Sequence, residues 1–253
     1  MKTNRLKEML RNGQQAVGCA ISLGDSASAE RLCKMGFDFV VIDTEHCPIA
    51  INQLETLLIA ATPTESTLVV RSPWNDPVRV KRILDVGAEG VVIPWVNSRE
   101  DAELAVSSCK YPPEGVRGCG PRRACFALAD SVEDYLAHAN EEVLLLGQIE
   151  TVRAMSNLES ILATEGLDGV MIGPTDLACS LGKKDDLKHD EVDEAIQTVL
   201  YTCREKDVPF GIFCGSPEMA KKWLDLGASL ATVGSDVGFM LTAARSAMNA
   251  VGR

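Results

Sequence analysis

The segment FDFVVIDTEH, residues 37–46, combines a buried-strand pattern with a cluster of ionisable side chains. Its mostly apolar part, residues 37–42, is rich in Val and Ile, as strands buried on both faces are. The run ends abruptly at Asp43, Glu45 and His46. Polar groups at the end of a buried strand are costly unless they are paired. We therefore expect these side chains to have a specific chemical or structural duty.

The same pattern recurs at three further strand-like segments. The apolar runs 68–70, 143–147 and 169–172 each lead directly into polar residues, which are Arg71, then Gln148 and Glu150, then Asp176. In a parallel α/β fold, the carboxyl ends of the strands meet on one side of the molecule. The sequence therefore predicts that these side chains gather at one site.

Strand-like and helix-like segments alternate along the chain. Strands are predicted at residues 16–23, 37–42, 67–70, 90–93, 143–149, 169–172, 209–213 and 230–233. Helices are predicted at residues 26–35, 51–61, 77–86, 98–109, 151–161, 192–206, 217–226 and 238–251. Eight such repeats predict an α/β protein with a (β/α)8 (TIM) barrel. The alternative is an open doubly wound sheet, although no G-x-G-x-x-G motif follows an early strand.

Length and charge limit the class of protein. The chain has 253 residues, of which 46% are hydrophobic, and this suits one barrel domain covering residues 1–253. Its net charge of −11, with no basic cluster, argues against nucleic acid and anionic membranes as partners. Residues 1–15 are charged and amphipathic, so we expect neither a signal peptide nor a membrane span, and a cytoplasmic location.

The nine cysteines agree with a reducing compartment. Their number is odd, no pair has C-x-x-C spacing, and they lie mainly within or beside apolar segments. We expect small buried side chains and no disulfide framework. Cys47 directly follows His46, so a Cys–His nucleophilic pair is an alternative, although neighbours on an extended segment point apart. The irregular excursion YPPEGVRGCGPRRA, residues 111–124, is predicted to be functional or part of an interface.

Glu150 and Asp176 are candidate metal ligands because they follow consecutive predicted strands. Two carboxylates without a nearby Cys or His ligand pair favour a hard divalent ion such as Mg²⁺ or Mn²⁺. The alternative is that each is an acid at the start of a helix.

Three further residues suggest proton chemistry at a carbonyl. Arg71 is always charged, so it must meet either an anion or a structural ion-pair partner. His46 is a candidate general base, or a hydrogen-bonded structural residue. Asp85 is predicted at a helix C-terminus, where an acid is unfavourable, and this suggests that it orients a base. No lysine ends an apolar strand, so a Schiff-base mechanism is not favoured.

At these residues the chain resembles the HpcH/HpaI aldolase family of class II, metal-dependent pyruvate aldolases. The resemblance is carried, in order, by GFDFVVIDTEH (36–46), VRSPWNDP (70–77), LDVGA (84–88), YPPEGVRG (111–118), QIET (148–151), IGPTDL (172–177) and VGSD (233–236). It implies a lyase that reversibly cleaves a 4-hydroxy-2-oxo acid to pyruvate and an aldehyde through a metal-bound pyruvate enolate. The implied cofactor is a divalent metal (Mg²⁺, Mn²⁺ or Co²⁺).

The resemblance also implies a role for each residue. Glu150 and Asp176 would bind the metal, which pyruvate would chelate beside Gln148. The loop of Gly173 and Pro174 would bind substrate, with the backbone N–H groups of Thr175 and Asp176 holding the pyruvate carboxylate. Arg71 would contact the keto or enolate oxygen. His46, paired with Asp85, would move the proton.

Assembly and substrate range follow from the same resemblance. It implies a homo-oligomer, namely a hexamer built from dimers. The two chains of each dimer would exchange their C-terminal helices, residues 238–251. The chain departs from the family at Ala20, where Trp is frequent, at Cys47, where Gly or Ala is frequent, and at residues 119–124. These positions would shape the aldehyde end of the pocket. The alternatives are a Mg²⁺-dependent lyase of CoA esters, of the citrate lyase or malyl-CoA type, and a non-catalytic pyruvate-binding homologue.

Overall fold

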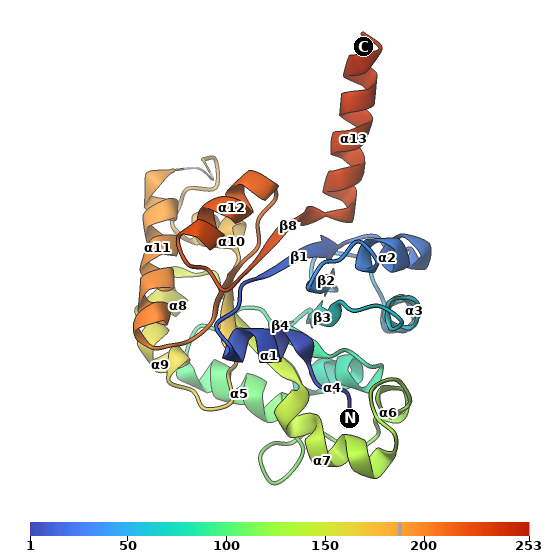
Figure 1. The fold of residues 1–253 in the computed structure, drawn as a ribbon. Helices are drawn as coiled ribbons and strands as arrows, with labels where there is room; N and C mark the ends of the chain where they lie inside the picture. Colours follow the sequence, from blue (N-terminus) through green and yellow to red (C-terminus); the bar gives the residue numbers. More distant parts are fainter. Residues whose placement is uncertain (187–188, 253) are drawn as a thin grey trace.

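A closed barrel of eight parallel strands forms the centre of the molecule (Figure 1). The computed structural model describes residues 1–186 and 189–252. The strands are β1 (Ala16–Ile21), β2 (Phe39–Asp43), β3 (Thr67–Arg71), β4 (Gly90–Ile93), β5 (Leu144–Ile149), β6 (Gly169–Ile172), β7 (Phe210–Ile212) and β8 (Leu230–Ser235). β8 pairs with β1 and closes the sheet. The predicted barrel is therefore confirmed, and the open doubly wound sheet is wrong.

The strands are buried on both faces, as their sequences predict. All residues of β2, β4, β5 and β6 are buried. Side chains that point into the barrel form a separate cluster, which contains Val41, Val69, Val92, Leu146 and Met171. Leu6 and Leu10 of α1 (Arg5–Arg11) join this cluster. The barrel interior is thus a packed core, and the polar residues are left to the strand ends.

Helices surround the barrel, and most lie where the sequence predicts them. They are α2 (Ser26–Cys33), α3 (Ile51–Ala61), α4 (Pro77–Asp85), α5 (Arg99–Cys109), α6 (Arg122–Leu128), α7 (Val132–Glu142), α8 (Val152–Ser156), α9 (Leu158–Leu162), α10 (Pro174–Ser180), α11 (Asp190–Glu205), α12 (Pro217–Asp225) and α13 (Asp236–Ala250). The predicted single helix 151–161 is wrong, because Asn157 leaves the helical conformation and separates α8 from α9. Its amide Nδ2 donates instead to the carbonyl of Asn97, 2.8 Å away. Helices α1, α6 and α7 were not among the predicted helices.

Helix α13 leaves the barrel and points away from it (Figure 1). Its first residue is fixed, because the Asp236 carboxylate accepts from the backbone N–H groups of Ser22 and Leu23 at 2.8–3.1 Å. Residues 240–250 are all exposed, among them Met240, Leu241 and Met248. Apolar side chains that no other described part of the chain covers are expected to pack against another molecule.

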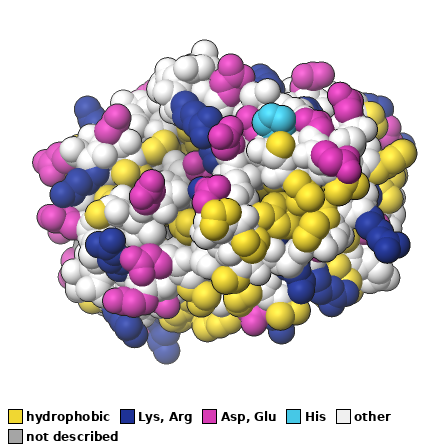
Figure 2. All heavy atoms as spheres, turned by 90° about the horizontal axis from the view of Figure 1, so that it is seen from below, with side chains coloured by type: hydrophobic (Ala, Val, Ile, Leu, Met, Phe, Trp, Pro, Cys, Tyr) yellow, Lys and Arg dark blue, Asp and Glu magenta, His cyan; other side chains and the backbone are white. Residues whose placement is uncertain are grey.

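The surface near α6 and α7 carries exposed apolar side chains among charged ones. Figure 2 views the molecule from below Figure 1 and shows apolar side chains gathered on this face. Phe126 of α6 is 91% exposed, and Val116 of the preceding excursion is also exposed. Within residues 1–186 and 189–252, no helix combines the length and apolar character needed to cross a membrane.

Candidate active site

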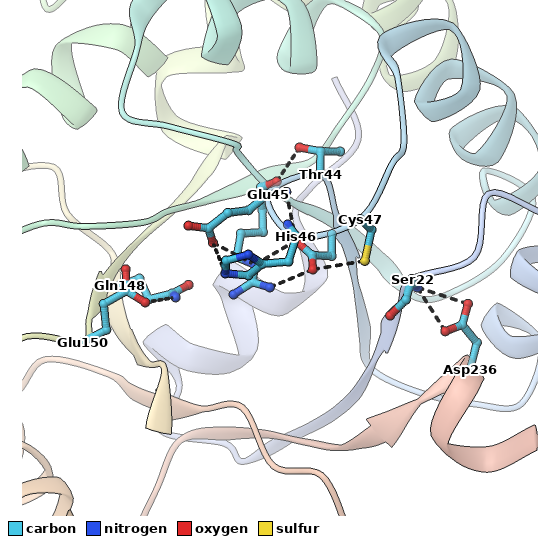
Figure 3. A network of polar contacts seen from close by, with 10 residues as sticks. Ser22, Thr44, Glu45, His46, Cys47, Gln148, Glu150 and Asp236 are labelled. Carbon is cyan, nitrogen blue, oxygen red and sulfur yellow. Dashed lines mark hydrogen bonds and ion pairs between the residues drawn. The ribbon is translucent and has the colours of Figure 1, made fainter. Parts of the chain in front are cut away.

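The polar residues that follow β2, β3 and β5 meet at the C-terminal end of the barrel. Figure 3 shows Glu45 and His46 lying between the Gln148–Glu150 pair on one side and Cys47 on the other. Asp43 and Arg71 are register partners at the ends of β2 and β3. The site therefore lies where the strand-end pattern predicts it.

Arg71 is held by two carboxylates. Its Nε and Nη2 donate to the two oxygens of Asp43 at 2.9 and 2.7 Å, and its Nε lies 3.3 Å from Glu45 Oε2. Burial would raise the pKa of Asp43, but the hydrogen bonds and charge of Arg71 outweigh it and leave that pKa lowered. Asp43 is therefore ionised at neutral pH. The Arg71 guanidinium also lies 5.1 Å from the ring centroid of Phe213, which limits its movement on another side.

Glu45 and Glu150 have unusually weak acidity. Burial raises the pKa of each to about 7. Arg71 opposes the rise at Glu45, and hydrogen bonds from Gln148 and Trp95 oppose it at Glu150. The charges of Glu45 and Asp176 add to the rise at Glu150, and the charges of Asp43 and Asp176 add to the rise at Glu45. Three carboxylates thus face a common space in which their charges repel.

The oxygen atoms of this space fit a hard divalent cation. Gln148 Nε2 donates to Glu150 Oε2, while Gln148 Oε1 is buried with no hydrogen-bond partner among the described residues. Glu45 Oε2 is likewise buried and makes ion pairs but no hydrogen bond in the described chain. Crowded acceptors with excess negative charge are the environment that Mg²⁺ and Mn²⁺ prefer. In the part of the chain that the structure describes, no group of three or more His, Cys, Asp or Glu could hold a metal. One or two carboxylates are the usual protein ligands of Mg²⁺, which keeps its other positions for water or substrate.

The loop after β6 approaches these groups closely because it contains glycine. A Cβ atom on Gly173 would lie 2.8 Å from Glu150 Oε2 and 3.0 Å from Gln148 Nε2, so a larger residue would displace them. Pro174 begins α10, and Asp176 lies half-buried in its first turn. Thr175 is exposed. N–H groups in a first helical turn have no acceptor within the helix, and they are available to an anion.

His46 stands at the edge of the site. Its side chain is 59% exposed, and its Nε2 lies 3.8 Å from Glu45 Oε2. The neighbouring Cys47 thiol donates to Asp43 at 3.3 Å, and burial raises its pKa to about 11. The thiol is therefore protonated at neutral pH, which disfavours the Cys–His nucleophilic alternative.

Asp85 does not contact His46 within one chain. The two residues share no hydrogen bond or ion pair in the described structure, and Asp85 instead accepts from Arg117 Nη2 at 2.9 Å. Arg117 is buried between the rings of Tyr111 and Tyr135, with ring centroids 4.5 and 5.6 Å from its guanidinium carbon. The expected His46–Asp85 pair is thus not formed in one copy, because a buried arginine of the excursion takes Asp85 as its counter-charge.

Asp43, Glu45 and Trp95 belong to the site but were not assigned a role from the sequence, and two of them hold another site residue in place. Asp43 orients Arg71, and the backbone N–H of Trp95 donates to Glu150 Oε1 at 2.7 Å. Both follow the strand-end pattern, since Asp43 ends β2 and Trp95 comes two residues after β4. The pattern could have identified them as members of the site, but only the folded chain shows which groups they contact.

The closed barrel and the acid-rich cluster at its C-terminal end define a (β/α)8-barrel enzyme. The HpcH/HpaI aldolase/citrate lyase family matches the chain over residues 16–243. A relative from Escherichia coli named 4-hydroxy-2-oxo-heptane-1,7-dioate aldolase is 40% identical over 243 residues, which are 96% of this chain and 93% of the relative. The chain belongs to the HpcH/HpaI aldolase/citrate lyase family and is a lyase of the aldolase class. The predicted family is confirmed.

Solved structures give the same result. An HpcH/HpaI aldolase/citrate lyase family protein from Burkholderia cenocepacia J2315 is 36% identical, with a TM-score of 0.94 over 99% of this chain and 100% of that one. An HpcH/HpaI aldolase from Desulfitobacterium hafniense DCB-2 is 29% identical, with a TM-score of 0.90 over 97% of this chain and 96% of that one. The likeness therefore extends over the whole barrel.

Proposed function

We propose that this chain is a divalent-metal-dependent aldolase that reversibly cleaves a 4-hydroxy-2-oxo acid to pyruvate and an aldehyde. The observation that carries the proposal is the pair of buried glutamates, Glu45 and Glu150, whose pKa values are both raised to about 7. They lie around Gln148 Oε1, which has no hydrogen-bond partner among the described residues. Buried acids that repel one another at a barrel mouth are typical of a functional site. The name of the Escherichia coli relative supports a 4-hydroxy-2-oxo acid as substrate.

Glu150 and Asp176 would hold the cation, with Gln148 beside it. When bound, the cation supplies positive charge that lowers the energy of the enolate formed from pyruvate. Gly173 and Pro174 leave room for the substrate, and the N–H groups of Thr175 and Asp176 would hold its carboxylate.

Arg71 would stabilise negative charge as it develops on the keto oxygen of pyruvate. Asp43 fixes its Nε and Nη2, so the guanidinium is oriented before substrate arrives. His46 would remove the proton from the C4 hydroxyl during cleavage and return it during addition. A catalytic role for Asp85 stays a prediction. Within one copy, Asp85 would first have to leave its ion pair with Arg117 and form a contact with His46.

The test is a panel of 4-hydroxy-2-oxo acids assayed for release of pyruvate. Activity should vanish on treatment with a chelator and return with Mg²⁺, Mn²⁺ or Co²⁺. Borohydride added with pyruvate should trap no lysine adduct, because no Schiff base forms. A trapped adduct, or full activity in the chelator, would disprove the proposal.

A CoA-ester lyase of the citrate lyase or malyl-CoA type is the alternative, since the family name includes citrate lyase. Cleavage of malyl-CoA in place of the free acids would favour it. A homologue that only binds pyruvate would bind it with metal and turn over none of these substrates.

We also propose a cytoplasmic homo-oligomer, most simply a hexamer. The exposed apolar side chains of α13 support association with further copies of the chain. All nine cysteines are free thiols, which agrees with a reducing compartment.

A further inference from the structure

A cleft between helices α3 and α4 takes no part in the chemistry proposed above. Its volume is about 660 Å³, which lies within the range of small-molecule sites. Its lining comes from both helices and from the loops that follow β2 and β3, and it includes Thr44, Leu54, Pro73 and Arg82. The cleft is therefore separate from the lining of the pyruvate site, but it shares the loop after β2 with it.

The inner part of the cleft is apolar. Ile49, Leu54 and Ile83 line it and are buried, whereas Val78, which also lines it, is 57% exposed. Buried apolar side chains that border an open cleft gain free energy when a hydrocarbon chain covers them. The cleft therefore suits a ligand with an apolar part.

The charged side chains of the cleft carry a net positive charge. Arg79 and Arg82 lie three residues apart on α4, so they face the same side of the helix. Neither guanidinium makes an ion pair or a hydrogen bond with a residue that the structure describes. Asp76, the acid of the lining, is engaged as the helix N-cap and accepts from the backbone N–H of Arg79 at 2.9 Å. Unpaired guanidinium groups are well suited to carboxylates and phosphates.

The loop after β2 joins the cleft to the candidate active site. Thr44 at its start and residues 49–50 at its end line the cleft, while Glu45 and His46 between them belong to the site. The Thr44 hydroxyl and backbone N–H both donate to the carbonyl of Arg71, at 2.6 and 3.2 Å. A ligand in the cleft would thus contact the residue that holds the backbone of Arg71.

We propose that this cleft is a second ligand site, which binds a small anion with an apolar chain and thereby changes turnover. The carboxylate or phosphate head would contact Arg79 and Arg82. The chain would cover Ile49, Leu54 and Ile83. Binding itself is independent of the proposed aldolase function, and only the effect on turnover rests on that function.

The first experiment is a calorimetric titration of the full-length protein, loaded with Mn²⁺ and saturated with pyruvate so that the proposed active site is filled. Octanoate and octyl phosphate are the probes, and they distinguish the two kinds of head. Acetate lacks the chain, and octanol lacks the charge. We expect at least one probe to bind at least about 10-fold more tightly than both acetate and octanol. If neither probe does so, the inference is overturned.

The second experiment locates the bound anion with variants of exposed residues. Arg79→Gln combined with Arg82→Gln should weaken binding of the probe by at least about 10-fold. Val78→Asp should also weaken it, and an acid in the first turn of α4 is favourable to the helix. The matched controls are Ile59→Asp, because Ile59 of α3 is 55% exposed and does not line the cleft, and Arg31→Gln on α2. Unchanged affinity in the folded cleft variants overturns the inference.

Oxaloacetate decarboxylation measures the effect on turnover. A saturating probe should change kcat at least about 2-fold in the wild-type enzyme and should no longer do so in the double arginine variant. If the probe binds and kcat stays the same, the link through Thr44 fails and the site remains. If the wild-type enzyme has no activity, the proposed function fails, and the titrations alone decide the site.

A second copy of the chain is the other candidate occupant of the cleft. In that case neither probe would bind to the wild-type protein, and the double arginine variant would have a lower assembly state by light scattering. This result would overturn the inference.

Discussion

Arg71 and Asp43 are register partners on adjacent strands and are joined by two hydrogen bonds, of 2.9 and 2.7 Å. A two-point contact fixes the plane of the guanidinium as well as its position. The direction in which Arg71 can approach a substrate oxygen is therefore determined by a carboxylate of the neighbouring strand.

Replacing Asp43 should weaken both the fold and the reaction. Asp43→Asn keeps the side-chain size but removes the charge opposite a mostly buried arginine, and the loss of one member of such a pair costs about 3 kcal/mol. Turnover should also fall, because Arg71 is then oriented only by Glu45. Thermal unfolding and steady-state kinetics at pH 7 measure the two effects, and wild-type values for both would contradict the role given to Asp43.

The stability effect of Asp43 should depend on pH. Its pKa in the folded chain lies below the ordinary value, because contacts with Arg71 outweigh burial. Such a carboxylate contributes its full stability above the unfolded-state pKa, about 3.9, and loses it as the pH falls through the folded-state pKa. The difference in melting temperature between wild type and Asp43→Asn should therefore shrink between pH 7 and pH 3. An equal difference at both pH values would argue against this linkage.

Glu150→Gln and Asp176→Asn should each prevent metal binding while the barrel stays folded. Loss of even an outer contact to a metal typically lowers affinity by about 10- to 100-fold, so loss of a ligand should exceed about 100-fold. Calorimetric titration with Mn²⁺ measures the change. Glu159→Gln is the control, because this glutamate is 79% exposed in α9. Unchanged Mn²⁺ affinity in either site variant would remove that residue from the ligand set.

Arg71→Ala and His46→Ala should separate the two halves of the reaction. Removing a donor that stabilises developing charge typically lowers the rate by about 10²–10³. Arg71→Ala should do so for both aldol cleavage and oxaloacetate decarboxylation, since both pass through the same enolate. His46→Ala should strongly reduce cleavage but spare part of the decarboxylation, which needs no base at C4. Equal loss of both reactions in His46→Ala would refute this division.

Helix α13 should be required for assembly. The wild-type chain should scatter light as an oligomer, most simply a hexamer, at micromolar concentration. Deleting residues 238–251 should lower the assembly state or leave the chain insoluble. Met240→Glu combined with Leu241→Glu tests the apolar face directly. Both side chains are exposed in the single chain, so the charges should disturb assembly but not the fold of the barrel. A monodisperse wild-type monomer would contradict the prediction.

The sequence by itself determined the barrel and the end of it at which the candidate site residues gather. Eight apolar runs separated by amphipathic segments admit few other arrangements, and the strand-end residues Asp43, Arg71, Gln148 and Glu150 fall on one side because all strands are parallel. Local pattern sufficed here because the apolar character that marks a buried strand is carried by the strand's own side chains. It failed at Asn157, whose backbone leaves the helical conformation and whose side-chain amide donates a hydrogen bond to the carbonyl of Asn97, distant in the chain.

Only the tertiary structure decided which side chains are partners. Asp85 was expected beside His46, yet closure of the barrel brings the excursion against α4 and buries Arg117, which requires the Asp85 charge. The raised pKa of Glu45 and the Trp74–Trp95 contact likewise depend on segments that are far apart in sequence. Pairing and burial are set by three-dimensional packing, and a strand-end pattern carries no information about the direction in which a side chain points.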